Sequence, residues 1–231
     1  MRKNMKSMKE WTVEAKWGKV AMVSWGDPAN PPVLLVHGYM DSAATFIFLV
    51  EQLPDDYYYV AFDLPGHGQS DPFPGGAVVS LLHMVEVVRL VVDYMRWEKF
   101  VYISHSMAVI IGMFYNHSSL MPAGDGKFTL TLVPKMKRIA SADVSPETLI
   151  TVLTVKTPPL LIVEASINIC AGPGKDFAAK IIQKCLTVRH SLSVTVEGSH
   201  DVHITNPDGV AKHVVEFLKS DFDRRFVRGK L

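Results

Sequence analysis

The sequence predicts an α/β fold, with a mostly parallel sheet covered by helices on both faces. Apolar runs of strand length alternate along the chain with segments of helical periodicity, the order that gives parallel strands with helical crossovers. Several runs are apolar without interruption, as expected of strands that are buried on both faces. The length of 231 residues fits one domain, 1–231, with a single sizeable core.

The N-terminal half begins with residues 11–25, which alternate loosely around Gly18 and predict an antiparallel hairpin at a sheet edge. Buried strands and amphipathic helices then follow in turn. The expected elements are strands at 33–38, 57–63 and 100–104, and helices at 79–97 and 107–115.

The C-terminal half returns to the same alternation after an irregular segment. The expected elements are strands at 158–165 and 191–198, and helices at 175–188 and 207–219. Residues 117–155 interrupt the alternation and resemble the remnant of a cap more than a core unit. Within this segment we expect a short strand, FTLTLV, and a helix that begins at Ser145, with Pro146 at its first position.

Composition excludes several classes of partner. A net charge of +1 provides no field for nucleic acid, and no apolar run is long enough to cross a membrane. The N-terminus lacks the apolar region of a secretory signal. Cys170 and Cys185 lie outside metal-ligand spacings, so we expect thiols in a reducing compartment and no metal site. Charge and composition therefore indicate no partner.

Ser106 lies in the stretch Ser104-His105-Ser106-Met107-Ala108, directly between a predicted strand and a predicted helix. A nucleophile elbow has this layout, and the positions two before and two after the nucleophile must be small. Ser104 and Ala108 meet that requirement. An ordinary turn serine remains the alternative reading of this stretch alone.

Two further motifs supply the other parts of an acyl-transfer site. His37-Gly38-Tyr39 follows a strand end, where a glycine lets the next N–H turn inward, so Tyr39 and Met107 are candidate oxyanion donors. His37 and Gly38 are candidates for contact with the substrate. The loop from Asp63 to Ser70 is expected to be architectural, with His67 as a loop residue.

His200 follows the last predicted strand and is the candidate general base. His203 and His213 are expected to be structural. The chain order of serine before histidine places the orienting acid between them. Glu164 is preferred because it ends a core strand, Asp143 is the second choice, and a site without an acid is equally open.

Together, the motifs HGYMDS, DLPGHGQS, SHSMA and EGSHDVHITNP resemble the α/β-hydrolase superfamily and, within it, the serine hydrolase-like proteins of animals. The resemblance covers most of 11–115 and about 128–220. It implies the α/β-hydrolase fold, with Ser106 as nucleophile, His200 as base, and Tyr39 and Met107 as oxyanion donors. It also implies that a small-molecule ester or related acyl compound is hydrolysed without a cofactor. The resemblance further implies an association with perinuclear vesicles or peroxisomes for a protein that we expect to be cytoplasmic. The final three residues differ from the peroxisomal Ser-Lys-Leu signal only at Gly229, and a frayed basic tail is the alternative reading.

The chain departs from that family in two respects. Both glycines of the family's Gly-His-Ser-x-Gly elbow are replaced, and the strand and cap that follow the elbow helix are expected to be reduced or missing. An open pocket admits water and weakens electrostatic catalysis, so we expect low or no turnover even from a reactive Ser106. The alternatives are a non-catalytic protein that keeps the fold to bind a ligand or partner, and a shortened product that barely folds.

Overall fold

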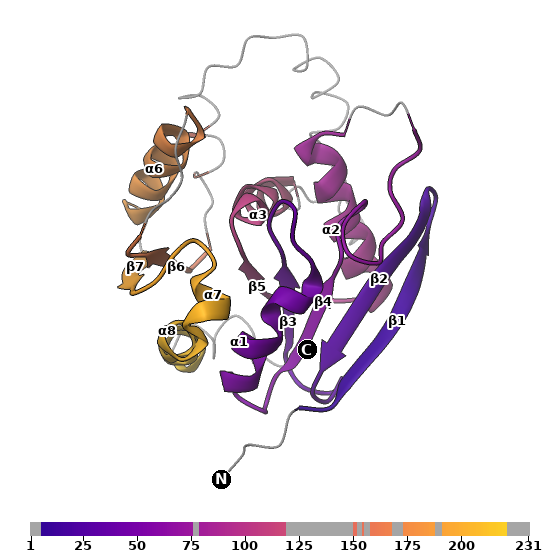
Figure 1. Ribbon diagram of the computed structural model, residues 1–231, viewed down its shortest axis with the longest axis horizontal. Coiled ribbons are helices and arrows are strands. Elements are labelled where there is room, and N and C mark those ends of the chain that lie inside the picture. The colour runs from indigo at the N-terminus through magenta and orange to yellow at the C-terminus, as the bar shows by residue number, and fades with distance from the viewer. Residues whose placement is uncertain are drawn as a thin grey trace, which may run out of the picture.

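The computed structural model describes residues 6–75, 79–118, 150–151, 154, 158–167, 173–187 and 191–220. Strands and helices alternate along most of this length (Figure 1). In chain order the N-terminal elements are β1 (Met8–Ala15), β2 (Gly18–Trp25), β3 (Pro32–Val36), η1 (Ala43–Phe46), α1 (Ile47–Gln52), β4 (Tyr58–Phe62), α2 (Leu81–Met95), β5 (Val101–Ser104) and α3 (Met107–Ser118). The C-terminal elements are β6 (Leu160–Ala165), α6 (Pro173–Leu186), β7 (Ser191–Val196), α7 (Val202–Thr205) and α8 (Pro207–Lys219).

A five-stranded sheet in the order β1-β2-β4-β3-β5 forms the centre of the N-terminal half. β1 and β2 pair antiparallel from Met8 opposite Trp25 to Ala15 opposite Gly18, which confirms the predicted edge hairpin. β3 lies parallel to both β4 and β5, with Leu34 opposite Val60 and Tyr102. The carboxyl ends of three parallel strands therefore meet at one edge, where sites in such sheets collect.

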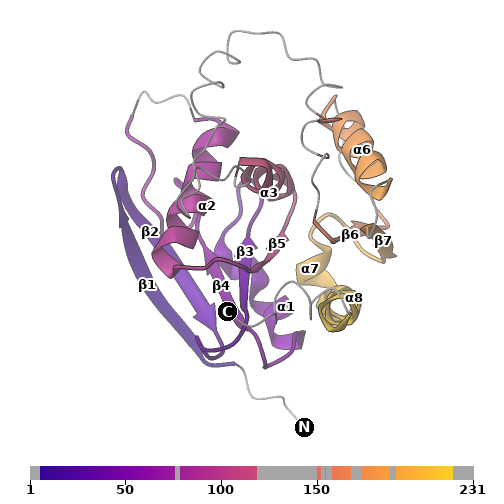
Figure 2. The same cartoon turned by 180° about the vertical axis from the view of Figure 1, so that it is seen from behind.

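The two faces of this sheet are apolar and carry different helices. Alternate residues of β3 and β4, such as Val33 and Tyr59, pack with Leu49 of α1 and Val214 of α8, whereas the intervening residues pack with α2 and α3. Figures 1 and 2 show α1 and α8 on one side of the sheet and α2 and α3 on the other. The predicted α/β class with helices on both faces is thus confirmed.

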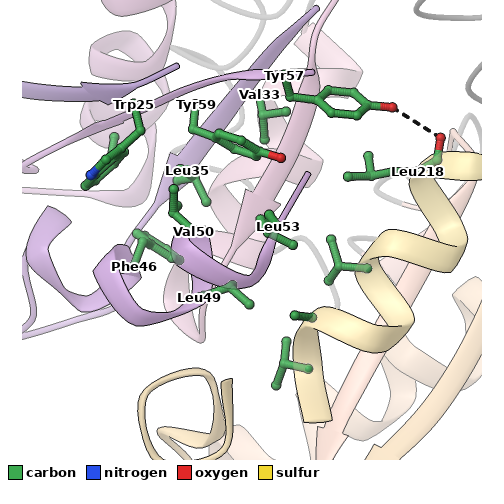
Figure 3. Close-up of a cluster of buried hydrophobic side chains, with 14 of the residues drawn as sticks. Trp25, Val33, Leu35, Phe46, Leu49, Val50, Leu53, Tyr57, Tyr59 and Leu218 are labelled. Atoms are coloured by element: carbon green, nitrogen blue, oxygen red, sulfur yellow. Dashed lines mark hydrogen bonds between the residues drawn. The ribbon is translucent and has the colours of Figure 1, made fainter. Parts of the chain in front are cut away.

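The first of these clusters joins the two halves of the chain. Tyr57 and Tyr59 are fully buried beside α1, and the Tyr57 hydroxyl donates to the Leu218 carbonyl of α8 at 3.2 Å (Figure 3). A phenol in an apolar cluster needs such a partner, because an unpaired buried hydroxyl is costly. This bond fixes the end of α8 against the central sheet.

Within the described residues, β6 and β7 form a separate two-stranded parallel sheet, with Leu160 opposite Ser191. The described chain holds no strand that hydrogen-bonds both β5 and β6. The expected strand FTLTLV and the expected helix start at Ser145 lie outside the described residues.

Three short elements were not predicted: η1, α1 and α7. The α1 stretch IFLVEQ is only six residues long, and α7 is four, so neither spans enough turns for a helical period to emerge. All the strands and helices that were predicted within the described residues are present, and their ends differ from the predicted ends by a few residues. No helix of the described chain is long and apolar enough to cross a membrane.

Candidate active site

Ser106 occupies a sharp turn between β5 and α3. Its φ of 54° lies in the left-handed region, which is unfavourable for a residue with a side chain and is typical of a nucleophile elbow. The turn is held from both sides, because His105 N–H donates to the Val36 carbonyl at 3.1 Å and Ala108 N–H donates to the His105 carbonyl at 3.1 Å. Ser106 is consequently exposed at the sheet's carboxyl edge.

The replaced elbow glycines are accommodated. Ala108 is fully buried in the cluster beneath α2 and α3, and its carbonyl accepts from the Tyr102 hydroxyl at 2.9 Å. The loop after β3 approaches the elbow closely at Gly38, where a Cβ would lie 3.0 Å from the Ser106 Cβ and 3.1 Å from His105 Nδ1. Gly38 therefore brings the loop after β3 against the elbow.

His200 reaches Ser106 from the far half of the chain. Its Nε2 lies 3.0 Å from Ser106 Oγ, within hydrogen-bonding distance. The loop that carries it turns at Gly198, whose φ is 146° and whose Cβ would lie 2.9 Å from Val202 Cγ2. Asn206 Nδ2 also donates to the Glu197 carbonyl at 2.9 Å and ties this loop to the start of α8. The structure thus brings together the predicted nucleophile and base.

The two candidate oxyanion donors lie on the loops that flank Ser106. Tyr39 follows Gly38 and is 69% exposed. Met107 is the first residue of α3, where the N–H groups lack intrahelical acceptors. The position of both residues fits the predicted role, which stays a prediction.

The predicted acid, Glu164, is on β6 and accepts a hydrogen bond from Ser193 Oγ of the neighbouring strand at 2.6 Å. Asp143 lies outside the described residues. Two carboxylates that the sequence did not single out lie near the elbow instead: Asp41 Oδ2 is 3.9 Å from His105 Nδ1, and Asp201 Oδ1 is 3.8 Å from His105 Nε2. The identity of the orienting acid stays a prediction.

His37 is fully buried, and its predicted contact with a substrate stays a prediction. Its Nδ1 lies 2.7 Å from the Gly38 carbonyl, and its Nε2 accepts from Leu64 N–H at 2.9 Å. The proton therefore sits on Nδ1, and the neutral ring satisfies both neighbours. Through these bonds the ring joins the loop after β3 to the loop after β4.

His37 also predicts a pH dependence of stability. Burial lowers the pKa of its imidazole below the ordinary value, against the smaller raising effect of the Gly38 hydrogen bond. In the unfolded chain the pKa of this imidazole is about 6.5, so the unfolded state binds the proton more readily than the folded state does. The contribution of neutral His37 to the free energy of unfolding is therefore complete above the pKa of the unfolded state. It is lost as the pH falls through the pKa of the folded state.

We expect the free energy of unfolding, measured by urea titration, to fall between pH 7 and pH 5, and to fall less in His37→Gln. Val60→Ala, which removes apolar contacts in the same core without removing an ionisable group, should keep the full difference between the two pH values. An equal difference in His37→Gln and the parent protein would contradict this assignment.

His105 and His203 form a second group of rings beneath the elbow, which sequence reasoning missed. The His105 ring lies between those of His200 and His203, with centroids 4.6 and 4.2 Å away. Burial lowers the pKa of His105, and burial, followed by the charge of His105, lowers that of His203 to about 4. Both rings are neutral near pH 7, and no sequence motif connects them.

Comparison with known proteins agrees with this geometry. Residues 31–116 match the model of the alpha/beta hydrolase fold family, a range that includes Ser106 and ends before His200. A human "Serine hydrolase-like protein" is 38% identical over 107 residues, 46% of this chain and 53% of that protein. A "Serine hydrolase-like protein" from Danio rerio is 40% identical over 114 residues, which are 49% of this chain and 34% of that protein. The matches thus span a third to a half of the length of these relatives.

Solved structures extend the likeness over most of the chain. A thioesterase domain from the curacin biosynthetic pathway superposes with a TM-score of 0.68 and 16% identity, covering 91% of this chain and 99% of that domain. A hypothetical protein from Pseudomonas aeruginosa gives a TM-score of 0.66 and 19% identity, with 91% and 99% covered. At these identities the likeness is one of fold.

Proposed function

From its α/β-hydrolase fold and its likeness to serine hydrolase-like proteins, we propose that the chain is a serine hydrolase that cleaves esters or related acyl compounds. The observation that carries the proposal is the pairing of Ser106 Oγ with His200 Nε2 at 3.0 Å, on an elbow whose φ is 54°. A strained, exposed serine beside an imidazole is the arrangement of an activated nucleophile.

In the proposed reaction, His200 Nε2 takes the hydroxyl proton as Ser106 Oγ attacks the acyl carbon. The backbone N–H groups of Tyr39 and Met107 stabilise the oxyanion, and the departing alcohol takes the proton from His200. A water molecule, deprotonated by His200, then attacks the acyl carbon. The bond between the acyl carbon and Ser106 Oγ breaks, Ser106 takes the proton back from His200, and the acid is released. Each step balances without a metal or a cofactor.

The proposal is tested by covalent labelling with a fluorophosphonate probe, which reacts with activated serines. We expect the intact protein to be labelled and Ser106→Ala to be unlabelled, because the reacting oxygen is removed. Ser199→Ala, which removes a hydroxyl beside His200, is the matched control and should be labelled like the parent. Equal labelling of Ser106→Ala would refute Ser106 as the nucleophile.

Two observations favour a second candidate, a non-catalytic hydrolase-like protein that binds a ligand or partner. The predicted acid, Glu164, hydrogen-bonds Ser193, and Ser106 and His200 are both exposed to solvent, where water weakens electrostatic catalysis. A folded protein that is never labelled would support this candidate. Turnover of short-chain chromogenic esters that depends on Ser106 would exclude it.

The location of the protein also stays a prediction. The resemblance supports a cytoplasmic protein at perinuclear vesicles or peroxisomes.

A further inference from the structure

Three potential metal ligands from separate parts of the chain meet beneath the elbow. Asp41 comes from the loop after β3, His105 precedes the nucleophile, and His203 lies on α7. One ligand atom of each lies within 4.8 Å of the others, and Asp41 Oδ2 is 3.9 Å from His105 Nδ1. Two imidazoles and one carboxylate are a donor set that binds divalent transition metals.

Two ring nitrogens in this group are buried without a hydrogen-bond partner: His105 Nδ1 and His203 Nδ1. The opposite nitrogens are engaged, because His105 Nε2 donates to the His200 carbonyl at 3.0 Å and His203 Nε2 bonds Thr45 Oγ1 at 2.7 Å. With its proton on Nε2, His105 keeps a lone pair at Nδ1. His203 is only 5% exposed, and no residue in the described part of the chain supplies a hydrogen-bond partner for its Nδ1, so this buried nitrogen is open to a ligand.

From this geometry we propose that Asp41 Oδ2, His105 Nδ1 and His203 Nδ1 bind a divalent transition-metal ion of the Zn²⁺ class. In a tetrahedral zinc site with bonds of about 2.0 Å, the ligand atoms lie about 3.3 Å apart, so ligand atoms that now lie within 4.8 Å of one another would have to approach by about 1.5 Å at most. A water molecule completes the four ligands. Imidazole nitrogen disfavours Mg²⁺ and Ca²⁺, which prefer oxygen.

The surroundings suit such a site. The His200 carbonyl and Thr45 Oγ1 hold the outer nitrogens of the two rings, as partners behind metal-binding imidazoles do. Ser42 N–H donates to Asp41 Oδ1 at 2.8 Å and orients that carboxylate. The neighbouring set of His105, His200 and Asp201 is less suitable, because His200 Nε2 and His105 Nε2 are already engaged.

The test is a Zn²⁺ titration of the metal-free protein against a chromophoric chelator, followed by Co²⁺ substitution and visible absorption spectroscopy. We expect one Zn²⁺ per chain and a tetrahedral Co²⁺ spectrum. Asp41→Asn and His203→Gln should each weaken Zn²⁺ binding at least 10-fold, whereas Asp201→Asn, His213→Gln and Ser106→Ala should bind as the parent does. Mg²⁺ at the same concentrations should not compete.

Absence of Zn²⁺ binding by the folded parent protein would overturn the proposal. So would unchanged binding in Asp41→Asn, a side chain that is partly exposed and whose replacement leaves the core intact. Loss of binding in Asp201→Asn or His213→Gln, without loss in Asp41→Asn, would place the metal elsewhere and equally overturn it. These readouts measure binding and do not depend on hydrolase activity.

Discussion

Replacing His200 with glutamine is expected to slow the reaction of Ser106 with a fluorophosphonate by about 10³-fold or more, because a serine hydroxyl is a weak nucleophile without a base. His200 Nε2 is 3.0 Å from Ser106 Oγ, and glutamine at this position cannot accept the proton during attack. The measurement is the second-order labelling rate at pH 7.5, with a chelator present so that bound metal does not interfere.

His213→Gln is the matched control, since this histidine lies on α8 with its Nδ1 3.8 Å from Glu216. Its labelling rate should stay within about twofold of the parent. A His200→Gln protein that reacts as fast as the parent would show that the imidazole does not activate Ser106. If the folded parent does not react at all, the non-catalytic candidate is the better description.

The sequence predicted the Ser106–His200 pair because each residue lies in the turn or loop that follows a recognisable strand, and parallel strands place their carboxyl ends together. The acid was harder to predict. Glu164 was chosen because it lies near the end of a core strand, but the direction of a side chain depends on cross-strand neighbours, and here Ser193 is its partner. Strand order therefore locates a site more securely than it locates every side chain in it.

The sequence could not predict that Asp41, His105 and His203 lie together, for a different reason. The three residues lie far apart along the chain and have no common motif, and His203 was expected only to be structural. Burial of a particular ring nitrogen is a property of packing, since it depends on how α7 docks against Thr45 and the elbow. Metal sites can be read from a sequence only when the ligands have a characteristic spacing.

Asp63→Ala is expected to lower the free energy of unfolding by about 4 kcal/mol, because two backbone donors lose a charged acceptor. Asp63 is 6% exposed; its Oδ1 accepts from Ala43 N–H at 2.7 Å and its Oδ2 from Gln69 N–H at 2.8 Å. The carboxylate thus ties the start of η1 to the loop after β4. Urea titration at pH 7 measures the loss.

Asp71→Ala is the matched control, because its Oδ2 also accepts a backbone N–H, that of Lys19 at 2.7 Å, in an exposed position. Water replaces an exposed acceptor, so this variant should lose only about 1 kcal/mol. Equal losses in the two variants would contradict the importance of burial at Asp63. Because Ala43 follows the loop that carries Gly38 and Tyr39, Asp63→Ala should also slow the labelling of Ser106 in protein that remains folded. The loop against the elbow is thus positioned by a carboxylate outside the site, and stability and reactivity are expected to fall together.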